Sequence, residues 1–259
     1  PQYKGTGGNK SMSAFQGLLK KDFDISKFWF LLWGIVIVLL LIISRAMEIY
    51  FHTPLTFLPF TVMMMFGFHI FFLPAMLLSM LHLEGKTQFW LYNPQSSKVL
   101  LLSKIVVCFI YQLIAQIFLT TIGLMIYQIH KAQFMIETAS LMKGITIINI
   151  GLLLAGLYFS CLFMFFWAIY HSLKKFPALK NWRWLVIVLV FLIYDIILTL
   201  LSKIEFLREI VQKWSIPDTM DLQLHYEKGA WKFLLNTTDI PILELVLYVI
   251  EALCLFLIS

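Results

Sequence analysis

The sequence predicts an all-α, polytopic membrane protein with six transmembrane helices and both termini on the cytoplasmic side. Three observations support this prediction: the composition, the long apolar runs, and the distribution of lysine and arginine. Apolar residues make up 61% and charged residues 13% of the 259 residues, whereas a soluble domain has about 45–50% and about 25%. This excess excludes an ordinary cytosolic enzyme, a disordered chain and a secreted disulfide scaffold, because too few polar residues remain to cover a soluble core.

Six apolar runs approach the length of about 20 residues that a helix needs to cross the hydrocarbon core of a bilayer. They cover residues 28–43, 59–83, 105–129, 145–170, 185–201 and 240–259. The second run contains Pro74, which removes a helix hydrogen bond and predicts a kink. Together the runs predict a bundle of six transmembrane helices.

The basic residues between the runs determine the predicted orientation. If the N-terminus is inside, the inner segments carry twelve lysines and arginines, and the short outer loops carry only Arg45, Lys131 and Lys143. The net charge of +6 is then explained by lysines and arginines that lie beside anionic lipid on the cytoplasmic side, and no nucleic-acid partner is needed to explain it. We therefore expect a multi-pass protein of the cell (plasma) membrane.

The first polar segment has two parts. Residues 1–11 show no apolar pattern and are interpreted as an added or disordered tail, with Met12 as the candidate natural start. In residues 12–27 apolar side chains recur at helical spacing, which predicts an interfacial amphipathic helix ahead of the first run. Residues 28–259 then form the six-helix transmembrane domain.

The second connection, residues 84–104, is the most informative polar segment. It reads EGKTQFWLYNPQSSKVLLLSK and is polar at both ends and aromatic in the middle. Exposed aromatic residues held near a membrane are typical of docking into a groove on a soluble partner. They also fit an aromatic belt at the lipid headgroups, and composition alone favours this second interpretation.

Two later connections indicate contact with lipid. Residues 171–184 contain four basic residues and no acidic one, which favours lipid anchoring, with a second partner contact as the alternative. The long segment 202–239 is predicted to be extracellular. Because residues 204–214 place apolar side chains on one helix face, we expect an amphipathic helix on the outer leaflet, with a lid over an exit as the alternative.

Three titratable residues inside the apolar runs are candidate cavity-lining residues: Asp195, Glu251 and His69. A carboxylate in lipid is costly, so each acid indicates either the polar wall of a translocation cavity or a paired group that fixes helix packing. The histidine fits a packing role better than a ligand role. We find no catalytic constellation and no metal-ligand spacing, so the sequence predicts neither an enzyme nor a cofactor or metal site in this chain.

The second connection and the segment KKDFDISK before the first run resemble the membrane subunit, or permease, of an ABC-2-type exporter. In that family the loop between the second and third spans forms the coupling helix that docks on the ATPase. It often reads as an acidic residue, an aromatic-rich stretch, a proline and a basic residue that leads into the third span. The resemblance assigns ATPase docking to Glu84, Phe89, Trp90, Tyr92, Asn93, Pro94 and Lys98, with Lys104 at the start of the third span.

The resemblance also implies partners. It implies a separate nucleotide-binding ATPase subunit that holds ATP and Mg, and a homodimer or heterodimer of membrane subunits in a bacterial membrane. The cargo it implies is peptide or lipid-like, and the exporters of amphipathic staphylococcal toxin peptides, the phenol-soluble modulins, are one similar group. That family usually carries a basic tail after the sixth span, so we expect the natural chain to continue beyond Ser259. The alternative function is an ion-coupled secondary transporter that uses Asp195 and Glu251 and needs no ATPase.

Overall fold

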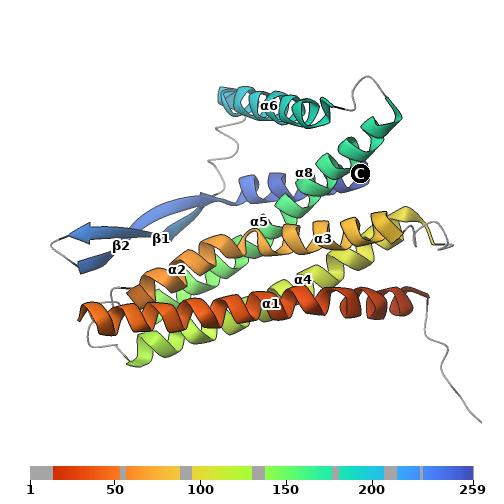
Figure 1. Ribbon diagram of the computed structural model, residues 1–259. Coiled ribbons are helices and arrows are strands. Elements are labelled where there is room, and N and C mark those ends of the chain that lie inside the picture. Colours follow the sequence, from red (N-terminus) through yellow and green to blue (C-terminus); the bar gives the residue numbers. More distant parts are fainter. Residues whose placement is uncertain are drawn as a thin grey trace, which may run out of the picture.

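The computed structural model describes residues 14–52, 57–87, 95–129, 138–176, 181–206, 215–227 and 230–258. The chain is mainly helical, as predicted, and also contains one two-stranded hairpin (Figure 1). The elements in chain order are α1 (Ala14–Phe51), α2 (Phe57–His69), α3 (Phe72–Thr87), α4 (Ser97–Ile129), α5 (Thr138–Ser172), the short 3-10 helix η2 (Leu173–Lys175), α6 (Arg183–Ser202), β1 (Ser215–Glu227), β2 (Ala230–Pro241) and α8 (Ile242–Ile258).

Several of these helices have the length and composition of membrane spans. Four of them, α1, α4, α5 and α6, are long and apolar enough to cross a bilayer, and the bent pair of α2 and α3 brings the number to five. The sixth apolar run forms α8, whose 17 residues are fewer than the about 20 of a typical span. The prediction of long apolar helices able to span a membrane is thus confirmed for four or five helices, and the count of six stays a prediction.

Helix α1 is longer than the sequence analysis predicted. We expected an interfacial helix over residues 12–27 that enters the first span, and α1 runs without a break from Ala14 to Phe51, with no proline inside it. Its 38 residues span about 57 Å at about 1.5 Å per residue, nearly twice the thickness of the hydrocarbon core. One continuous helix therefore contains both the predicted interfacial segment and the first apolar run.

Helices α2 and α3 form the predicted kinked segment. Their axes differ in direction by 47° across a short break at Ile70 and Phe71. Pro74 lies in the first turn of α3, where a helix tolerates a missing N–H, but it cannot donate to the carbonyl of Ile70. The kink is confirmed. It lies just before the proline, because a new helix, α3, begins at Phe72.

The bundle is built around α3, α4 and α5. Helix α1 packs on α4 and α2, α3 packs on α5 and α4, and α8 packs on α5 (Figure 1). The main core contains Leu73, Leu77 and Met80 of α3 together with Cys108 of α4 and Met164 of α5. Helix α6 packs mainly on α5, and the apolar window that qualifies it as a span is 0% buried.

The hairpin of β1 and β2 is the element that the sequence analysis did not predict. The strands pair antiparallel, with a register shift between Ile216 and Thr219, and β2 leads directly into α8. The expected amphipathic helix over residues 204–214 falls mostly outside the described residues. The missed signal is the strict alternation of polar and apolar residue types from Thr219 to Tyr226, which is typical of a strand.

Candidate functional site

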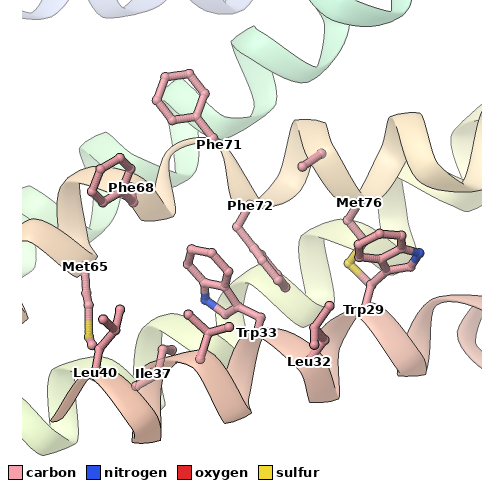
Figure 2. Close-up of a pocket in the computed structure, with 12 residues that line it drawn as sticks. Trp29, Leu32, Trp33, Ile37, Leu40, Met65, Phe68, Phe71, Phe72 and Met76 are labelled. Carbon is pink, nitrogen blue, oxygen red and sulfur yellow. The ribbon is translucent and has the colours of Figure 1, made fainter. Parts of the chain in front are cut away.

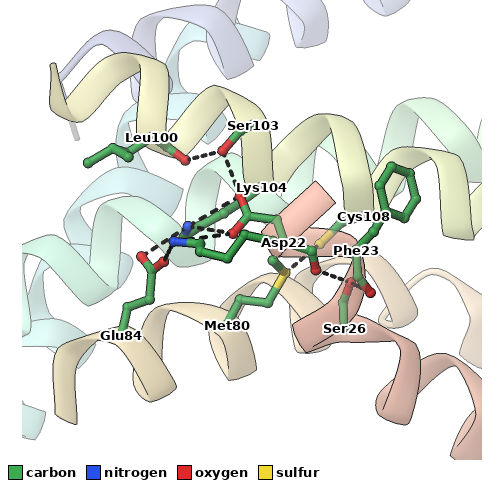
Figure 3. A network of polar contacts seen from close by, with 10 residues as sticks. Asp22, Phe23, Ser26, Met80, Glu84, Leu100, Ser103, Lys104 and Cys108 are labelled. Atoms are coloured by element: carbon green, nitrogen blue, oxygen red, sulfur yellow. Dashed lines mark hydrogen bonds and ion pairs between the residues drawn. The ribbon is translucent and has the colours of Figure 1, made fainter. Parts of the chain in front are cut away.

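Four charged side chains meet where α1, α3 and α4 come together (Figure 3). Lys104 Nζ lies 3.2 Å from Asp22 Oδ1 and 2.9 Å from Glu84 Oε2, and the Lys104 and Asp22 side chains are only 1% and 0% exposed. At the rim, Lys21 Nζ lies 2.6 Å from Glu84 Oε1. We refer to Lys21, Asp22, Glu84 and Lys104 as the ionic cluster. Two lysines and two carboxylates leave it without net charge.

Neighbouring polar groups complete the hydrogen bonding of this cluster. The hydroxyl of Ser103 donates to Asp22 Oδ2 at 2.6 Å, and the hydroxyl of Ser26 donates to the Asp22 carbonyl at 2.6 Å. The hydroxyl of Tyr111 on α4 donates to the carbonyl of Phe23 on α1 at 3.2 Å. A buried charge is tolerated only when it is paired and hydrogen-bonded, and Asp22 meets both conditions.

Glu84 directly follows the apolar run that ends at Leu83. Partial burial by itself would raise the pKa of its carboxyl, but the hydrogen bonds and positive charges of Lys21 and Lys104 outweigh this effect. The pKa of Glu84 is therefore lowered from its ordinary value. The two lysines thus favour the ionised form of the carboxyl, and charge-assisted hydrogen bonds hold the cluster together.

The cluster lies at both ends of the predicted coupling loop. Glu84 is near the end of α3, and Lys98 is exposed in the first turn of α4, six residues before the buried Lys104 on the same helix. The other predicted docking residues belong to the segment 88–94, which lies outside the described residues. They are Phe89, Trp90, Tyr92, Asn93 and Pro94. The helices that flank this loop are thus tied to each other and to α1.

Glu84 and Lys104 were singled out from the sequence, but their partner Asp22 was not. A signal for Asp22 was present in the spacing of residues. It follows Leu18 by four positions and precedes Ser26 by four, so all three lie on one helix face. Leu18 is buried at 6% exposure, and Asp22 and Ser26 are both at 0%. An acid on the apolar face of an amphipathic helix indicates a buried ion pair.

The predicted cavity-lining residues lie in separate places. His69 ends α2 and is 0% exposed, with its ring stacked on Phe72 at 5.3 Å between centroids. Asp195 is exposed on α6. In the described part of the chain, no group of three or more His, Cys, Asp and Glu side chains is arranged to hold a metal ion.

Glu251 on α8 belongs to a second polar group, between α5, α6 and α8. Its carboxylate accepts hydrogen bonds from the hydroxyls of Tyr194 and Tyr158, and the two hydroxyls lie 2.6 Å apart. A carboxyl held by two phenols fits the packing interpretation of this residue, because the hydrogen bonds join three helices. It also keeps a titratable group inside the apolar part of the bundle.

An apolar cavity of about 440 Å³ lies between α1 and the bent pair of α2 and α3 (Figure 2). Its lining consists of Trp29, Leu32, Trp33, Val36, Ile37, Leu40, Met65, Phe68, Phe71, Phe72, Ala75 and Met76. None of the three predicted cavity-lining residues is among them. A wall of aromatic, aliphatic and thioether groups without a charged side chain suits an apolar chain or the apolar face of a helix.

The long apolar helices and the bundle they form indicate a helical membrane protein with four or five helices able to span a bilayer. The chain is 32% identical over 190 residues to the uncharacterized protein YhcE of Bacillus subtilis (strain 168), a match that covers 71% of this chain and 73% of that protein. The chain belongs to the same family as YhcE. No family model matches the chain, and no solved structure matches it.

Proposed function

We propose that this chain is the membrane-spanning subunit of an ABC-2-type exporter that moves an amphipathic peptide or a similar hydrophobic cargo out of the cell. A separate ATPase subunit binds ATP and Mg and drives transport, so this chain carries no catalytic site. Two membrane subunits form a dimer in a bacterial plasma membrane. The observation that carries the proposal is the ionic cluster, because it joins the two helices flanking the coupling loop to α1.

The cluster supports the proposal for a mechanical reason. A loop that docks on an ATPase can drive transport only if its displacement reaches the spans. Separating α1, α3 and α4 would leave Asp22 or Lys104 unpaired in a buried site, which is strongly unfavourable. The three helices are therefore expected to move as one unit when the coupling loop moves.

The proposed topology assigns six spans to the helices. These are α1, the bent pair of α2 and α3, α4, α5, α6 and α8, with both termini in the cytoplasm. Helix α8 would cross about 26 Å at about 1.5 Å per residue, slightly less than the hydrocarbon core. In this arrangement the ionic cluster lies at the cytoplasmic surface, and the hairpin of β1 and β2 lies outside the cell.

The apolar cavity supports the proposed class of cargo. It lies against α1, the helix that the ionic cluster links to the coupling loop. Met65 and Met76 line it together with several aromatic rings, and thioether side chains repack readily around differently shaped apolar groups. A helical peptide with one apolar face fits such a surface.

The first experiment is purification of the chain from its native membrane in mild detergent, followed by mass spectrometry of the proteins that co-purify. The proposal predicts a stoichiometric soluble subunit that hydrolyses ATP. A folded preparation without any nucleotide-binding protein would contradict it.

The second experiment tests the coupling loop itself. In the complex reconstituted with its ATPase, Trp90→Ala is expected to uncouple ATP hydrolysis from transport, because a buried aromatic anchor commonly dominates a docking interface. Tyr50→Ala is the matched control, since Tyr50 is an aromatic residue that is 79% exposed near the end of α1 far from the ionic cluster. Transport-linked ATPase activity that is the same in both variants and in the unaltered complex would refute the docking role.

The polar group around Glu251 favours one second candidate, an ion-coupled secondary transporter. A carboxyl beside two tyrosine hydroxyls inside apolar helices is a chemically suitable acceptor for a proton or a cation. This candidate predicts flux that follows a proton or sodium gradient in vesicles containing only this chain. The exposed position of Asp195 on α6 gives Glu251 the larger role in such a mechanism.

A further inference from the structure

Buried polar atoms without partners gather near the break between α2 and α3. His69 at the end of α2 is 0% exposed, and Gln112 and Gln116 on α4 are 0% and 2% exposed. Trp33 projects from α1 beside Phe72, which lies just after the break (Figure 2). In this region of the described chain, four buried atoms lack a hydrogen-bond partner: Trp33 Nε1, His69 Nδ1, Gln112 Oε1 and Gln116 Oε1.

The hydrogen bonds that these residues make determine the character of the remaining atoms. Gln112 Nε2 donates to the His69 carbonyl at 3.4 Å, and Gln116 Nε2 donates to the Asn149 carbonyl at 3.2 Å. Rotating either amide by half a turn would place its oxygen against a carbonyl oxygen, so the orientation of both amides is fixed. Each Oε1 atom is therefore the acceptor that is left over. His69 Nε2 faces the Gln112 carbonyl at 3.5 Å and must donate, which leaves Nδ1 of the neutral ring as an acceptor.

Three of these residues lie next to one another. The Trp33 and His69 rings are 5.9 Å apart between centroids, and His69 and Gln112 are linked by two contacts. Gln116 lies one turn further along α4. The same place is where Pro74 cannot donate to the carbonyl of Ile70. In membrane proteins, an interrupted helix beside buried polar groups is a recurring place for small polar ligands and ordered water.

We propose that internal water occupies this break and bridges Trp33 Nε1, His69 Nδ1 and Gln112 Oε1. The set offers one donor, Trp33 Nε1, and two acceptors, His69 Nδ1 and Gln112 Oε1. Water fits this set because one water molecule can accept one hydrogen bond and donate two. A buried water makes about three hydrogen bonds, which is the number of atoms that these residues offer. None of the residues is a carboxylate, so the set offers no counter-charge for a cation.

The water gives the break a physical property that a dry core would lack. When the angle between α2 and α3 changes, a bridging water can shift and keep its hydrogen bonds, whereas a direct contact would be lost. The inference is independent of the proposed export function, because it concerns only groups within this chain. It holds equally if no ATPase partner exists.

The test is nuclear magnetic resonance of the full chain in detergent micelles, with the tryptophan indole nitrogens labelled. We expect a cross-peak between the Trp33 indole proton and water. Loss of that signal in Trp33→Phe, or in Trp33→Tyr if the first variant does not fold, assigns it. The indole of Trp182, which is 58% exposed, is the positive control. Two results together would overturn the proposal. The water cross-peak would be absent, and in D2O the Trp33 indole proton would still be present after that of Trp182 has exchanged.

A second measurement distinguishes water from a bound cation. The midpoint of thermal unfolding is measured in sodium chloride and in choline chloride, for the unaltered chain and for Gln112→Leu. If water is the occupant, the difference in unfolding midpoint between sodium chloride and choline chloride is the same for the unaltered chain and for Gln112→Leu. A stabilisation by sodium that disappears in Gln112→Leu would show that a cation, rather than water, occupies the break.

Discussion

Replacing Lys104 with methionine removes the charge that lies between Asp22 and Glu84 while keeping a side chain of similar length. The remaining cluster has two carboxylates and only Lys21, whose side chain is 40% exposed. Removing one partner of a buried ion pair destabilises a protein by about 3–5 kcal/mol. In a chain of this size each kcal/mol lowers the unfolding midpoint by about 2–4 °C. We therefore expect Lys104→Met to lower the midpoint by about 6–20 °C.

The assay is thermal unfolding of the purified full chain in one detergent. Lys98→Met is the matched control, because Lys98 lies on the same helix and is exposed. Substitutions of exposed side chains usually change stability by less than about 0.5 kcal/mol, so its midpoint should move by about 2 °C at most. Equal midpoints for the two variants would refute the reasoning that the ionic cluster holds the helices together.

A double-mutant cycle tests the direct pairing with Asp22. Asp22→Asn preserves the shape of the side chain and removes its charge. The effects of Lys104→Met and Asp22→Asn should be non-additive by about 0.5–3 kcal/mol, because each substitution removes the same interaction. Additive effects would mean that the 3.2 Å contact between the two side chains contributes little to stability.

Two further predictions concern the bent pair. Glu48, which is 3% exposed, accepts a hydrogen bond from the backbone N–H of Leu58 at 2.9 Å and another from Arg45 at 3.0 Å. Glu48→Ala removes this helix cap and should lower the unfolding midpoint by several degrees, since a lost cap costs about 0.5–2 kcal/mol. Pro74→Ala restores a backbone N–H at position 74 that can donate to the carbonyl of Ile70. It should straighten the 47° bend and lengthen the distance between the start of α2 and the end of α3 from about 40 Å to about 43 Å.

Each of these predictions has its own control. For the cap, Glu205→Ala changes an exposed acid and should leave the midpoint unchanged, and a similar fall in both variants would contradict the capping role. For the bend, spin labels at Phe57 and Lys86 report the distance by pulsed electron paramagnetic resonance. An unchanged distance in Pro74→Ala would mean that packing, rather than the proline, maintains the bend.

The helices could be predicted because each long apolar run satisfies its own backbone hydrogen bonds. The run containing Pro74 shows this well, since the kink follows from the chemistry of one residue. The strands were missed because the length and position of the segment 202–239 suggested an interfacial helix. The alternation from Thr219 to Tyr226 carried the correct local information, but the prediction for this segment rested only on the apolar spacing in residues 204–214.

The candidate site could be predicted only in part. Glu84 and Lys104 were predicted as the boundaries of the proposed coupling loop, because charged residues are conspicuous beside apolar runs. Their pairing with Asp22 depends on how α1 packs against α3 and α4, and helical spacing within one segment does not determine the packing between segments. The partners of Glu251 remained hidden for the same reason, since Tyr158 and Tyr194 come from two other helices.

The unbroken length of α1 makes it a lever. A rod of about 57 Å that pivots near its middle moves each tip by about 5 Å for a tilt of about 10°. Asp22 lies near one end of this rod, and Glu48, which holds the start of α2, lies near the other. A small rotation imposed at the end near Asp22 would therefore displace the end near Glu48 by a similar distance.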